Sequence, residues 1–363
     1  MTPPKRILVV DDAVVIRKIL TDLISAEPGL EVAGTAPNGR IALAKIPQVN
    51  PDLITLDVEM PEMDGLSTLK ELRRTYRDLP VIMFSTLTER GGRVTMDALL
   101  SGANDYVTKP GSVAGLAEGV ATVREQLLPK IRALCGLAPE AEQPRVPVQA
   151  PRRAASTGRI EVVAIGVSTG GPDALAQLFA RLPADLPVPV VVAQHMPPTF
   201  TRLLAERLDA VGPLRVAEAA PGLPLLPGAA WIAAGGHHLV VQRSSAGAVQ
   251  AFDDGPPENS CKPAVDVLFR SVAEVYGPSA LGVVLTGMGK DGLRGCQHLR
   301  AAGASILVKD EASSVVWGMP GAVARAGLAD RVLPMASVAG AIDARARLGR
   351  RSPALSGRAR VAR

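Results

Sequence analysis

Short apolar runs of strand length alternate along the chain with segments whose apolar residues recur at helical spacing. Amphipathic helices are predicted, for example, over Val14–Ala26 and Leu66–Tyr76. The strands predicted in the first part of the chain are Arg6–Val10, Glu31–Gly34, Asp52–Leu56, Pro80–Phe84 and Asp105–Val107. Five strand–helix units that end near residue 128 predict a flavodoxin-like α/β domain with a five-stranded parallel sheet.

A second alternating stretch begins at Arg159 and runs to about residue 345, which predicts a second domain with a doubly wound α/β sheet. Its apolar runs are Val162–Val167, Val188–Ala193, Ala230–Ala233, Leu281–Leu285 and Ser305–Val308. The stretch between the domains is rich in Pro, Ala and Arg, lacks apolar periodicity and is predicted to be a linker. The expected organisation is therefore a first domain over 1–128, a linker over 129–158, a second domain over 159–345 and a tail over 346–363.

Composition agrees with two globular domains, because 47% of the 363 residues are hydrophobic and 21% are charged. The chain starts without a signal-like segment and contains no apolar run of about 18 residues, so we expect no membrane span. Its three cysteines, Cys135, Cys261 and Cys296, form no C-x-x-C pair, which argues against a zinc site or a disulfide framework. A cytoplasmic setting is expected.

The positive charge is concentrated at the carboxyl end. Seven arginines and no acids lie between Ala344 and Arg363, so they exceed the net charge of +5 of the whole chain. We expect this basic tail to be disordered, with contact to an acidic partner as the alternative. The rest of the chain is slightly acidic, which does not favour a nucleic-acid-binding domain.

Charged side chains follow three strands of the first predicted sheet. Asp11 and Asp12 follow the first strand, Asp57 the third and Lys109 the fifth. Because the carboxyl ends of parallel strands meet at one edge, three carboxylates would gather there and favour a hard cation such as Mg²⁺. Lys109 could pair with a transferred phosphoryl group, and Ser85 offers a hydroxyl at the same edge. The alternative is that the acids cap helices and Lys109 is a surface residue.

The motifs "VVDD", "LDVEMPEMDG", "FST" and "DYVTKP" occur in the order and spacing of response-regulator receiver domains, which residues 4–128 resemble. The resemblance implies that Asp57 accepts a phosphoryl group from a histidine kinase. Mg²⁺ would be held by Asp11, Asp12, Asp57 and the carbonyl of Glu59. The remaining roles would be a switch hydroxyl at Ser85, a rotating aromatic at Tyr106, a phosphate partner at Lys109 and a cis bond between Lys109 and Pro110.

The stretch "IGVSTGG", from Ile165 to Gly171, opens the second domain and allows two interpretations. A dinucleotide fingerprint needs a glycine where Ser168 stands and an acid about twenty residues further on, and neither is present. Binding of a small anion remains open. The stretch also contains G-x-S-x-G, a turn that can expose Ser168 as a nucleophile.

A nucleophilic serine needs a base and a group that orients the base. His195 follows the strand after Ser168, and Asp291 lies at the end of the strand and turn "LGVVLTGMGKDG", so both are expected at the same edge. The order Ser, His, Asp differs from that of the α/β-hydrolases. Backbone N–H groups after Ser168 and around Met288 could stabilise an oxyanion. The alternative is a turn serine and a structural histidine.

Residues 160–345 resemble the catalytic domain of the CheB chemotaxis protein-glutamate methylesterases. The resemblance rests on "IGVSTGGPDAL", "VVAQHMPPTFT", "AERLD", "GGHHLVV", "PAVDVLFRSVA", "GVVLTGMGKDG" and "DEASSVVWGMPGAV". It implies the roles of nucleophile for Ser168, base for His195, its partner for Asp291 and oxyanion donor for the Met288 backbone, with Thr169 and His237 close by.

One stretch departs from that family's pattern. Cys261-Lys262-Pro263-Ala264 stands where the family commonly has His-Arg-Pro-Ser. We interpret this as a change at the rim of the substrate site that does not reach the triad.

The resemblance implies a phosphorylation-activated enzyme that hydrolyses glutamate γ-methyl esters on chemoreceptors, releases methanol and deamidates receptor glutamines. A CheA-type histidine kinase would donate the phosphoryl group, and the unphosphorylated receiver would obstruct the active site. Three alternatives stay open: a response regulator that binds DNA, a hydrolase of small esters, and the same fold serving another signalling system. Oligomeric state and preferred receptor sites are left undetermined.

Overall fold

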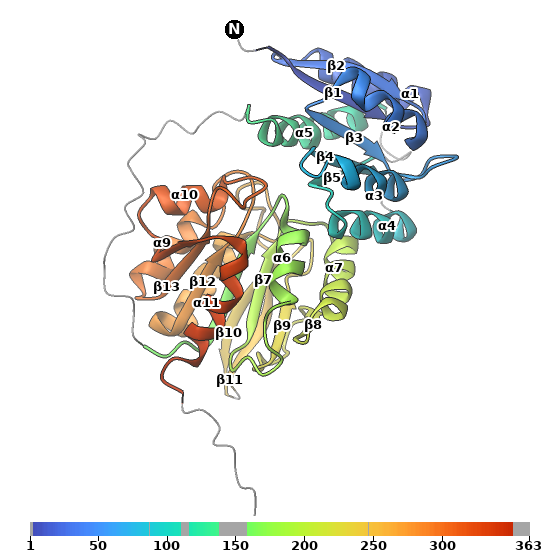
Figure 1. Cartoon of the computed structure of the whole chain (residues 1–363). Coiled ribbons are helices and arrows are strands. Elements are labelled where there is room, and N and C mark those ends of the chain that lie inside the picture. The colour runs from blue at the N-terminus through green and yellow to red at the C-terminus, as the bar shows by residue number, and fades with distance from the viewer. Residues whose placement is uncertain (1–2, 87, 110–115, 138–157, 246, 351–363) are drawn as a thin grey trace, which may run out of the picture.

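The computed structural model describes residues 3–86, 88–109, 116–137, 158–245 and 247–350 of the chain. Two α/β units are stacked on one another, with the amino-terminal unit at the top of Figure 1. The central part of the predicted linker, the basic tail beyond residue 350 and the Lys109–Pro110 bond lie outside the described residues.

The amino-terminal unit contains the predicted five-stranded parallel sheet, in the order β2-β1-β3-β4-β5. Its strands are β1 (Lys5–Val10), β2 (Leu30–Ala36), β3 (Leu53–Asp57), β4 (Val81–Ser85) and β5 (Asp105–Thr108). Its helices are α1 (Val14–Ser25), α2 (Gly39–Val49), α3 (Gly65–Thr75), α4 (Glu89–Leu100) and α5 (Leu116–Leu134). The flavodoxin-like prediction is confirmed, and α5 continues past residue 128 to Leu134.

Polar side chains fix where three of these helices begin. The side chains of Asn38, Asp64 and Thr88 each accept a hydrogen bond from a backbone N–H in the first turn of α2, α3 and α4. Such caps satisfy donors that have no partner within the helix. The loops at the carboxyl edge of the sheet therefore end at defined points, which helps to hold the side chains between strand and helix.

The second unit is built on a seven-stranded parallel sheet in the order β14-β13-β12-β6-β7-β9-β8. The strands are β6 (Val162–Val167), β7 (Val190–Gln194), β8 (Arg215–Glu218), β9 (Ala229–Ile232), β12 (Ala280–Val284), β13 (Ser305–Lys309) and β14 (Arg331–Leu333). An antiparallel hairpin of β10 (His238–Ser244) and β11 (Gly247–Asp253) is added. The helices are α6 (Gly171–Phe179), α7 (Pro198–Val211), α8 (Val265–Tyr276), α9 (Leu293–Ala301), α10 (Met319–Arg325) and α11 (Met335–Arg347).

Helices cover both faces of this sheet, as the alternation of side chains along β6 requires. Val163 and Ile165 belong to the core under α6, α7 and α11, whereas Val162 and Ala164 belong to the core under α8, α9 and α10. A strand that is buried on both faces has a continuous run of apolar residues in the sequence, which is why β6 could be predicted. The doubly wound architecture is confirmed.

The first strand of this unit, β6, lies in the middle of the sheet between β12 and β7. The connection after β6 runs toward β7 on one side, and the connection after β12 runs toward β13 on the other side. The loops that follow β6 and β12 therefore diverge. In open α/β sheets such a switch point leaves a crevice at the carboxyl edge where ligands bind.

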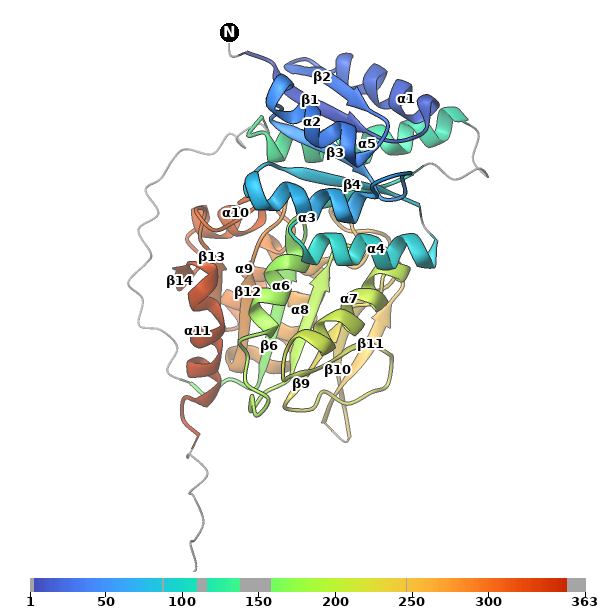
Figure 2. The same ribbon diagram turned by 45° about the vertical axis from the view of Figure 1, so that its right-hand side comes forward.

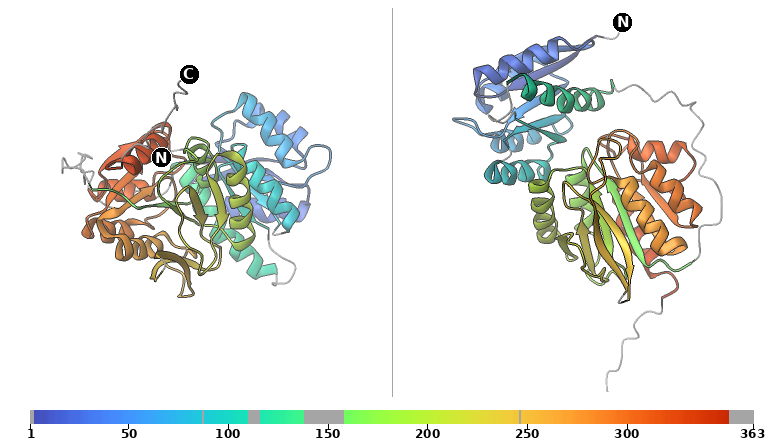
Figure 3. Two further views of the ribbon diagram at one scale, coloured as in Figure 1. Left: turned by 90° about the horizontal axis from the view of Figure 1, so that it is seen from below. Right: turned by 180° about the vertical axis from the view of Figure 1, so that it is seen from behind.

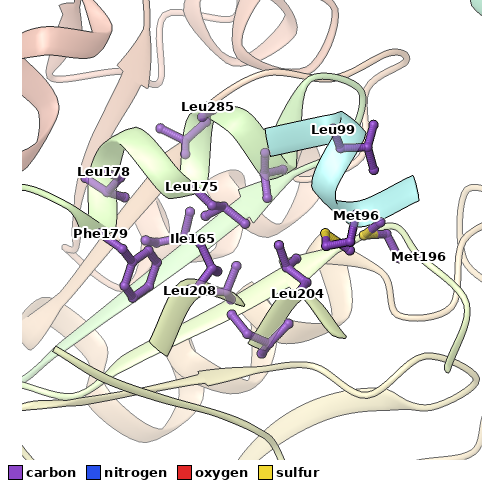
Figure 4. Packing of buried hydrophobic residues seen from close by; sticks show 14 of the residues in the cluster. Met96, Leu99, Ile165, Leu175, Leu178, Phe179, Met196, Leu204, Leu208 and Leu285 are labelled. Atoms are coloured by element: carbon purple, nitrogen blue, oxygen red, sulfur yellow. The ribbon is translucent and has the colours of Figure 1, made fainter. Parts of the chain in front are cut away.

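The two units pack on one another through α4, α6 and α7. In Figures 1 and 2, α4 of the first unit lies against α7 of the second, and the view from behind in Figure 3 shows the same pairing. Met96 and Leu99 of α4 belong to one continuous apolar cluster with Met196 and Leu204, and Figure 4 shows them side by side. Two ion pairs, Glu89–Arg202 at 3.1 Å and Asp97–Arg207 at 2.7 Å, flank this cluster.

Candidate active site and phosphoacceptor site

Ser168 lies directly after β6, in a turn that requires glycine at positions 170 and 171. Gly170 adopts a left-handed conformation with φ of 73°, and a Cβ on Gly171 would lie 1.9 Å from the side-chain oxygen of Gln194. The chain therefore turns tightly from β6 into α6, and the Ser168 N–H donates to the carbonyl of Thr286. The glycines of the sequence motif shape this turn and hold the serine at the edge of the sheet.

The structure brings Ser168, His195 and Asp291 together. The Ser168 Oγ lies 3.1 Å from the His195 Nδ1, and the His195 Nε2 lies 2.7 Å from the Asp291 Oδ2. The three residues follow the adjacent strands β6, β7 and β12. A hydroxyl, an imidazole and a carboxylate in a hydrogen-bonded row can move a proton from the hydroxyl to the imidazole.

His195 is held between groups that favour its charged form. Burial alone would lower its pKa, but the hydrogen bonds to Asp291 and Cys261 outweigh burial and raise the pKa to about 9. The His195 side chain is 12% exposed, so water screens these contacts weakly. The imidazole is accordingly a strong base in this arrangement.

Asp291 is fixed by backbone donors at the start of α8. Its Oδ2 accepts the N–H of Val265, and its Oδ1 accepts the N–H groups of Asp266 and Gly292. Burial would raise the pKa of Asp291, but the bonds from His195 and from the N–H groups of Val265 and Asp266 keep the pKa below its usual value. The carboxylate stays ionised and faces the imidazole.

Asn259 also contacts the Asp291 carboxylate, and the sequence pattern did not predict this residue. The Asn259 Nδ2 donates to the Asp291 Oδ1 at 2.9 Å. Nothing in the local pattern singles out this asparagine, because it lies in a loop without periodicity.

The expectation that the Cys261 stretch affects only the rim is wrong. The Cys261 Sγ lies 3.3 Å from the His195 Nδ1, the same atom that faces Ser168. The tight turn over Glu258–Cys261 carries the thiol inward to the imidazole.

His237 is not brought to Ser168. Its Nδ1 lies 2.5 Å from the Asp254 Oδ1, and its ring stacks on Phe252, where it is 44% exposed. Successive side chains alternate where β10 begins, so His238 points inward and His237 outward. The buried His238 ring instead contacts the Pro256 carbonyl and the N–H of Ala264.

Ser168, Thr169 and Met288 line a cavity of about 670 Å³ between the two units. Residues of the amino-terminal unit close its other side, among them Asp105, Tyr106 and Lys130. A cavity of this size fits a side chain of a partner protein or a small ligand.

The amino-terminal unit makes polar contacts beside the serine. The Thr169 hydroxyl donates to the Asp105 Oδ2 at 2.6 Å, and the Gly170 N–H donates to the Asn104 carbonyl at 3.0 Å. The other carboxylate oxygen of Asp105 accepts from Lys130 at 2.7 Å. The groups next to Ser168 are therefore occupied by the first unit.

A second polar site lies at the carboxyl edge of the first sheet. Asp11 and Asp57 are buried, Asp12 is exposed, and one carboxylate oxygen from each lies within 4.8 Å of the others. The Lys109 Nζ contacts Asp11 at 2.9 Å and Asp57 at 2.8 Å. Oxygen ligands in this arrangement fit a hard divalent cation, and the donor set therefore agrees with the predicted Mg²⁺.

Burial changes the acidity of this site. Burial raises the pKa of Asp57 to about 6, against the lowering effect of the hydrogen bond from Lys109. The Glu59 N–H lies 3.4 Å from the Asp57 Oδ1, at the outer limit of a hydrogen bond. Asp57 and Lys109 form a largely buried ion pair at this edge of the sheet.

The predicted switch residues are placed away from solvent. The Ser85 hydroxyl accepts from Thr95 at 2.7 Å and is fully buried, at the end of β4. The Tyr106 ring stacks on Phe200 of α7, with 4.4 Å between ring centroids. The aromatic of the first unit is thus packed against the second unit.

Together the fold and the geometry define a class of protein: a response regulator whose receiver-like unit covers an α/β unit with a serine–histidine–aspartate cluster. Residues 7–121 match the response regulator receiver domain, and residues 163–342 match the CheB methylesterase domain. The described helices include none long and apolar enough to cross a membrane.

The chain is similar to curated full-length proteins over nearly its whole length. The chain is 52% identical over 344 residues to a protein-glutamate methylesterase/protein-glutamine glutaminase of Trichodesmium erythraeum, covering 93% of this chain and 97% of that one. The corresponding enzyme of Nocardioides sp. is 50% identical over 97% of this chain and 98% of its own. The Thermotoga maritima CheB methylesterase catalytic domain matches with a TM-score of 0.50 and 38% identity, over 52% of this chain and 99% of that one. The chain belongs to the CheB family of methylesterases with an amino-terminal receiver domain.

Proposed function

We propose that this chain is a protein-glutamate methylesterase and protein-glutamine glutaminase that acts on chemoreceptors under the control of its receiver domain. The observation that carries the proposal is the hydrogen-bonded row of Ser168, His195 and Asp291 beside the cavity between the domains. The names of the full-length relatives support the substrate class.

The row supports acyl transfer in two steps. The Ser168 Oγ attacks the carbonyl carbon of a glutamate γ-methyl ester while His195 Nδ1 takes its proton. The tetrahedral intermediate collapses, and the methoxy oxygen takes that proton and leaves as methanol. Water then gives a proton to His195 and attacks the glutamyl ester, which releases glutamate and returns the proton to Ser168. An amide in place of the ester would release ammonia by the same route.

Backbone N–H groups near the serine suit the developing oxyanion. The start of α6 brings helix N–H groups and their positive dipole end beside Ser168, and Met288 lines the same cavity. The Gly170 N–H is bound by the Asn104 carbonyl in this arrangement. A movement of the receiver away from α6 would free this donor.

The contacts that the first domain makes beside Ser168 and on α7 support control of the reaction by the receiver. Asn104 and Asp105 bind the groups next to Ser168, and Tyr106 stacks on Phe200. The inactive form would be this closed arrangement. Phosphorylation of Asp57 would shift the population toward an open one.

Asp57 is the proposed phosphoacceptor, with a CheA-type histidine kinase as donor in the cytoplasm. Asp11, Asp12 and Asp57 would hold Mg²⁺, with the Glu59 carbonyl as a further ligand. When bound, Mg²⁺ neutralises negative charge on the phosphoryl oxygens. Lys109 would pair with the phosphoryl group, and Ser85 would respond to it as the switch hydroxyl.

The proposal is tested by measuring methanol release from methylated chemoreceptor in membranes with the full chain and with Ser168→Ala. We expect Ser168→Ala to abolish release while Asp57 still accepts a phosphoryl group from a small phosphodonor. Near-normal release by Ser168→Ala would show that another residue is the nucleophile. Hydrolysis of a free ester without action on methylated receptor would identify a small-ester hydrolase instead.

A further inference from the structure

A narrow turn between β11 and α8 lies against the proposed triad. Glu258 and Cys261 bond to each other through both backbone N–H groups, at 3.1 and 3.0 Å. Asn259 and Ser260, at the tip, adopt left-handed conformations with φ of 52° and 61°. Asparagine tolerates this conformation better than most residues, so the turn suits the residue at position 259.

An ion pair holds the turn to the protein. Both carboxylate oxygens of Glu258 bind the guanidinium of Arg270 on α8, at 2.8 and 2.6 Å. Bidentate pairs of this kind restrict orientation as well as distance. The ion pair therefore restricts the position of the turn, and with it that of the Asn259 side chain.

The side-chain amide of Asn259 lies between two buried carboxylates. The Asn259 Nδ2 is 2.9 Å from the Asp291 Oδ1 and 3.0 Å from the Asp266 Oδ2. Asp291 and Asp266 are 2% and 1% exposed. An amide nitrogen carries two N–H donors and no acceptor, so it can satisfy both carboxylates at once.

Without this amide the two acids would interact directly. Burial raises the pKa of Asp266, and the charge of Asp291 raises it further. Two neighbouring buried carboxylates repel each other, so the ionised form of Asp291 would be less stabilised without the amide between them.

We propose that Asn259 is a positioning residue for the esterase reaction, which separates Asp291 from Asp266 and keeps the Asp291 carboxylate directed at His195. The inference rests on the proposed function, because it assigns a task within the same triad. Asn259 acts through Asp291 and does not need to touch the substrate.

The charged groups around the triad set the expected pH effect. His195 faces Asp291 and the Cys261 thiol, Asp291 also faces Asp266, and the nearby Glu258 is paired with Arg270. Loss of the amide leaves Asp291 less stabilised and more basic, so it draws the proton of imidazolium more strongly. The acid limb of the pH–rate profile then moves to higher pH.

The experiment compares the full chain with Asn259→Gly and Asn259→Asp. Glycine keeps the left-handed backbone and removes the side chain, whereas aspartate keeps the shape but loses the donors. The matched control is Asn50→Gly, which makes the same change at an exposed left-handed asparagine in the receiver. Methanol release from methylated receptor is measured across pH, with melting temperature and the rate of Ser168 labelling by a fluorophosphonate.

We expect kcat to fall by about tenfold or more in Asn259→Gly, as for a lost hydrogen bond to a charged group, with little change in KM. The acid limb should move to higher pH, further in Asn259→Asp, and Asn50→Gly should match the parent. An unchanged kcat and pH profile would overturn the inference. Equal, pH-independent losses in both variants with a lowered melting temperature would also overturn it, since they indicate a structural role. If the parent labels at Ser168 but releases no methanol, the proposed substrate is wrong, and the labelling rates across pH still test Asn259.

Discussion

At the scale of single residues, His195 has neighbours on both ring nitrogens. Its Nε2 faces Asp291, and its Nδ1 faces both Ser168 and Cys261. Asp291 and Cys261 favour imidazolium, whereas the proposed reaction requires the neutral ring. This competition would make the proposed activity depend on pH.

The first residue-scale prediction concerns the pH profile. The folded pKa of His195 is raised to about 9 from an ordinary value of 6.5, so the fraction of neutral base grows as pH rises through about 9. We expect kcat/KM for ester hydrolysis to rise with pH up to that value. The same shift stabilises the fold fully below pH about 6.5, and this stabilisation is lost as pH rises through about 9. An acid limb near 6.5 would contradict the prediction.

The second concerns Cys261. Its thiol raises the pKa of His195, so Cys261→Ala should move the acid limb of the same profile to lower pH. Cys135→Ala, in the amino-terminal domain, serves as the control. The prediction fails if the limb stays in place or if both variants move it equally.

At the scale of elements, the short strand β5 joins the two sites. Asp105 begins the strand and binds Thr169 beside the proposed nucleophile. Lys109 follows its other end and contacts Asp57. A strand of four residues spans roughly 13 Å, so a shift of Lys109 would have to be transmitted over only a short segment to reach Asp105.

The third prediction tests this contact. Asp105→Asn should weaken the buried bond to Thr169 and increase basal methanol release by the unphosphorylated chain several-fold. Hydrogen bonds to charged groups contribute about 1.5–3 kcal/mol when buried. Asp97→Asn removes the half-exposed pair with Arg207, and such pairs contribute about 0–1 kcal/mol, so this control should change release less than Asp105→Asn. Equal effects of both substitutions would show that the Asp105 contact has no special part in inhibition.

Elements also show what the chain's pattern could and could not predict. The fully buried strands β6, β7 and β12 were predictable because both of their faces are apolar. The edge strands β8 and β14 were missed, because they have four and three residues and expose some of them. Asn259 was missed for another reason: its role depends on two carboxylates that reach it only in the folded chain.

At the scale of the whole molecule, the receiver domain packs over the proposed esterase site. The two share one apolar cluster that includes Met96 and Met196. Opening would expose this surface, so the closed arrangement is favoured until another free-energy term offsets the loss of burial.

The fourth prediction follows from this arrangement. Deleting about residues 1–140 should raise basal methanol release above that of the unphosphorylated full chain, because Asp105 and Asn104 no longer occupy the groups beside Ser168. Phosphorylation of the full chain should approach the same rate. Lower activity in the truncated protein would rule out simple inhibition by the receiver.

The amino-acid sequence by itself determined the two α/β folds, the edges at which the polar residues gather, and the family. Strand and helix periodicity act locally, and the motifs at strand ends place Asp57, Ser168, His195 and Asp291 without knowledge of distant contacts. Only the tertiary structure decided that Cys261 reaches His195, that Asn259 lies between two acids and that Asp105 binds Thr169. These contacts join residues far apart in the chain, and packing of loops and domains, which leaves no periodic pattern, determines them.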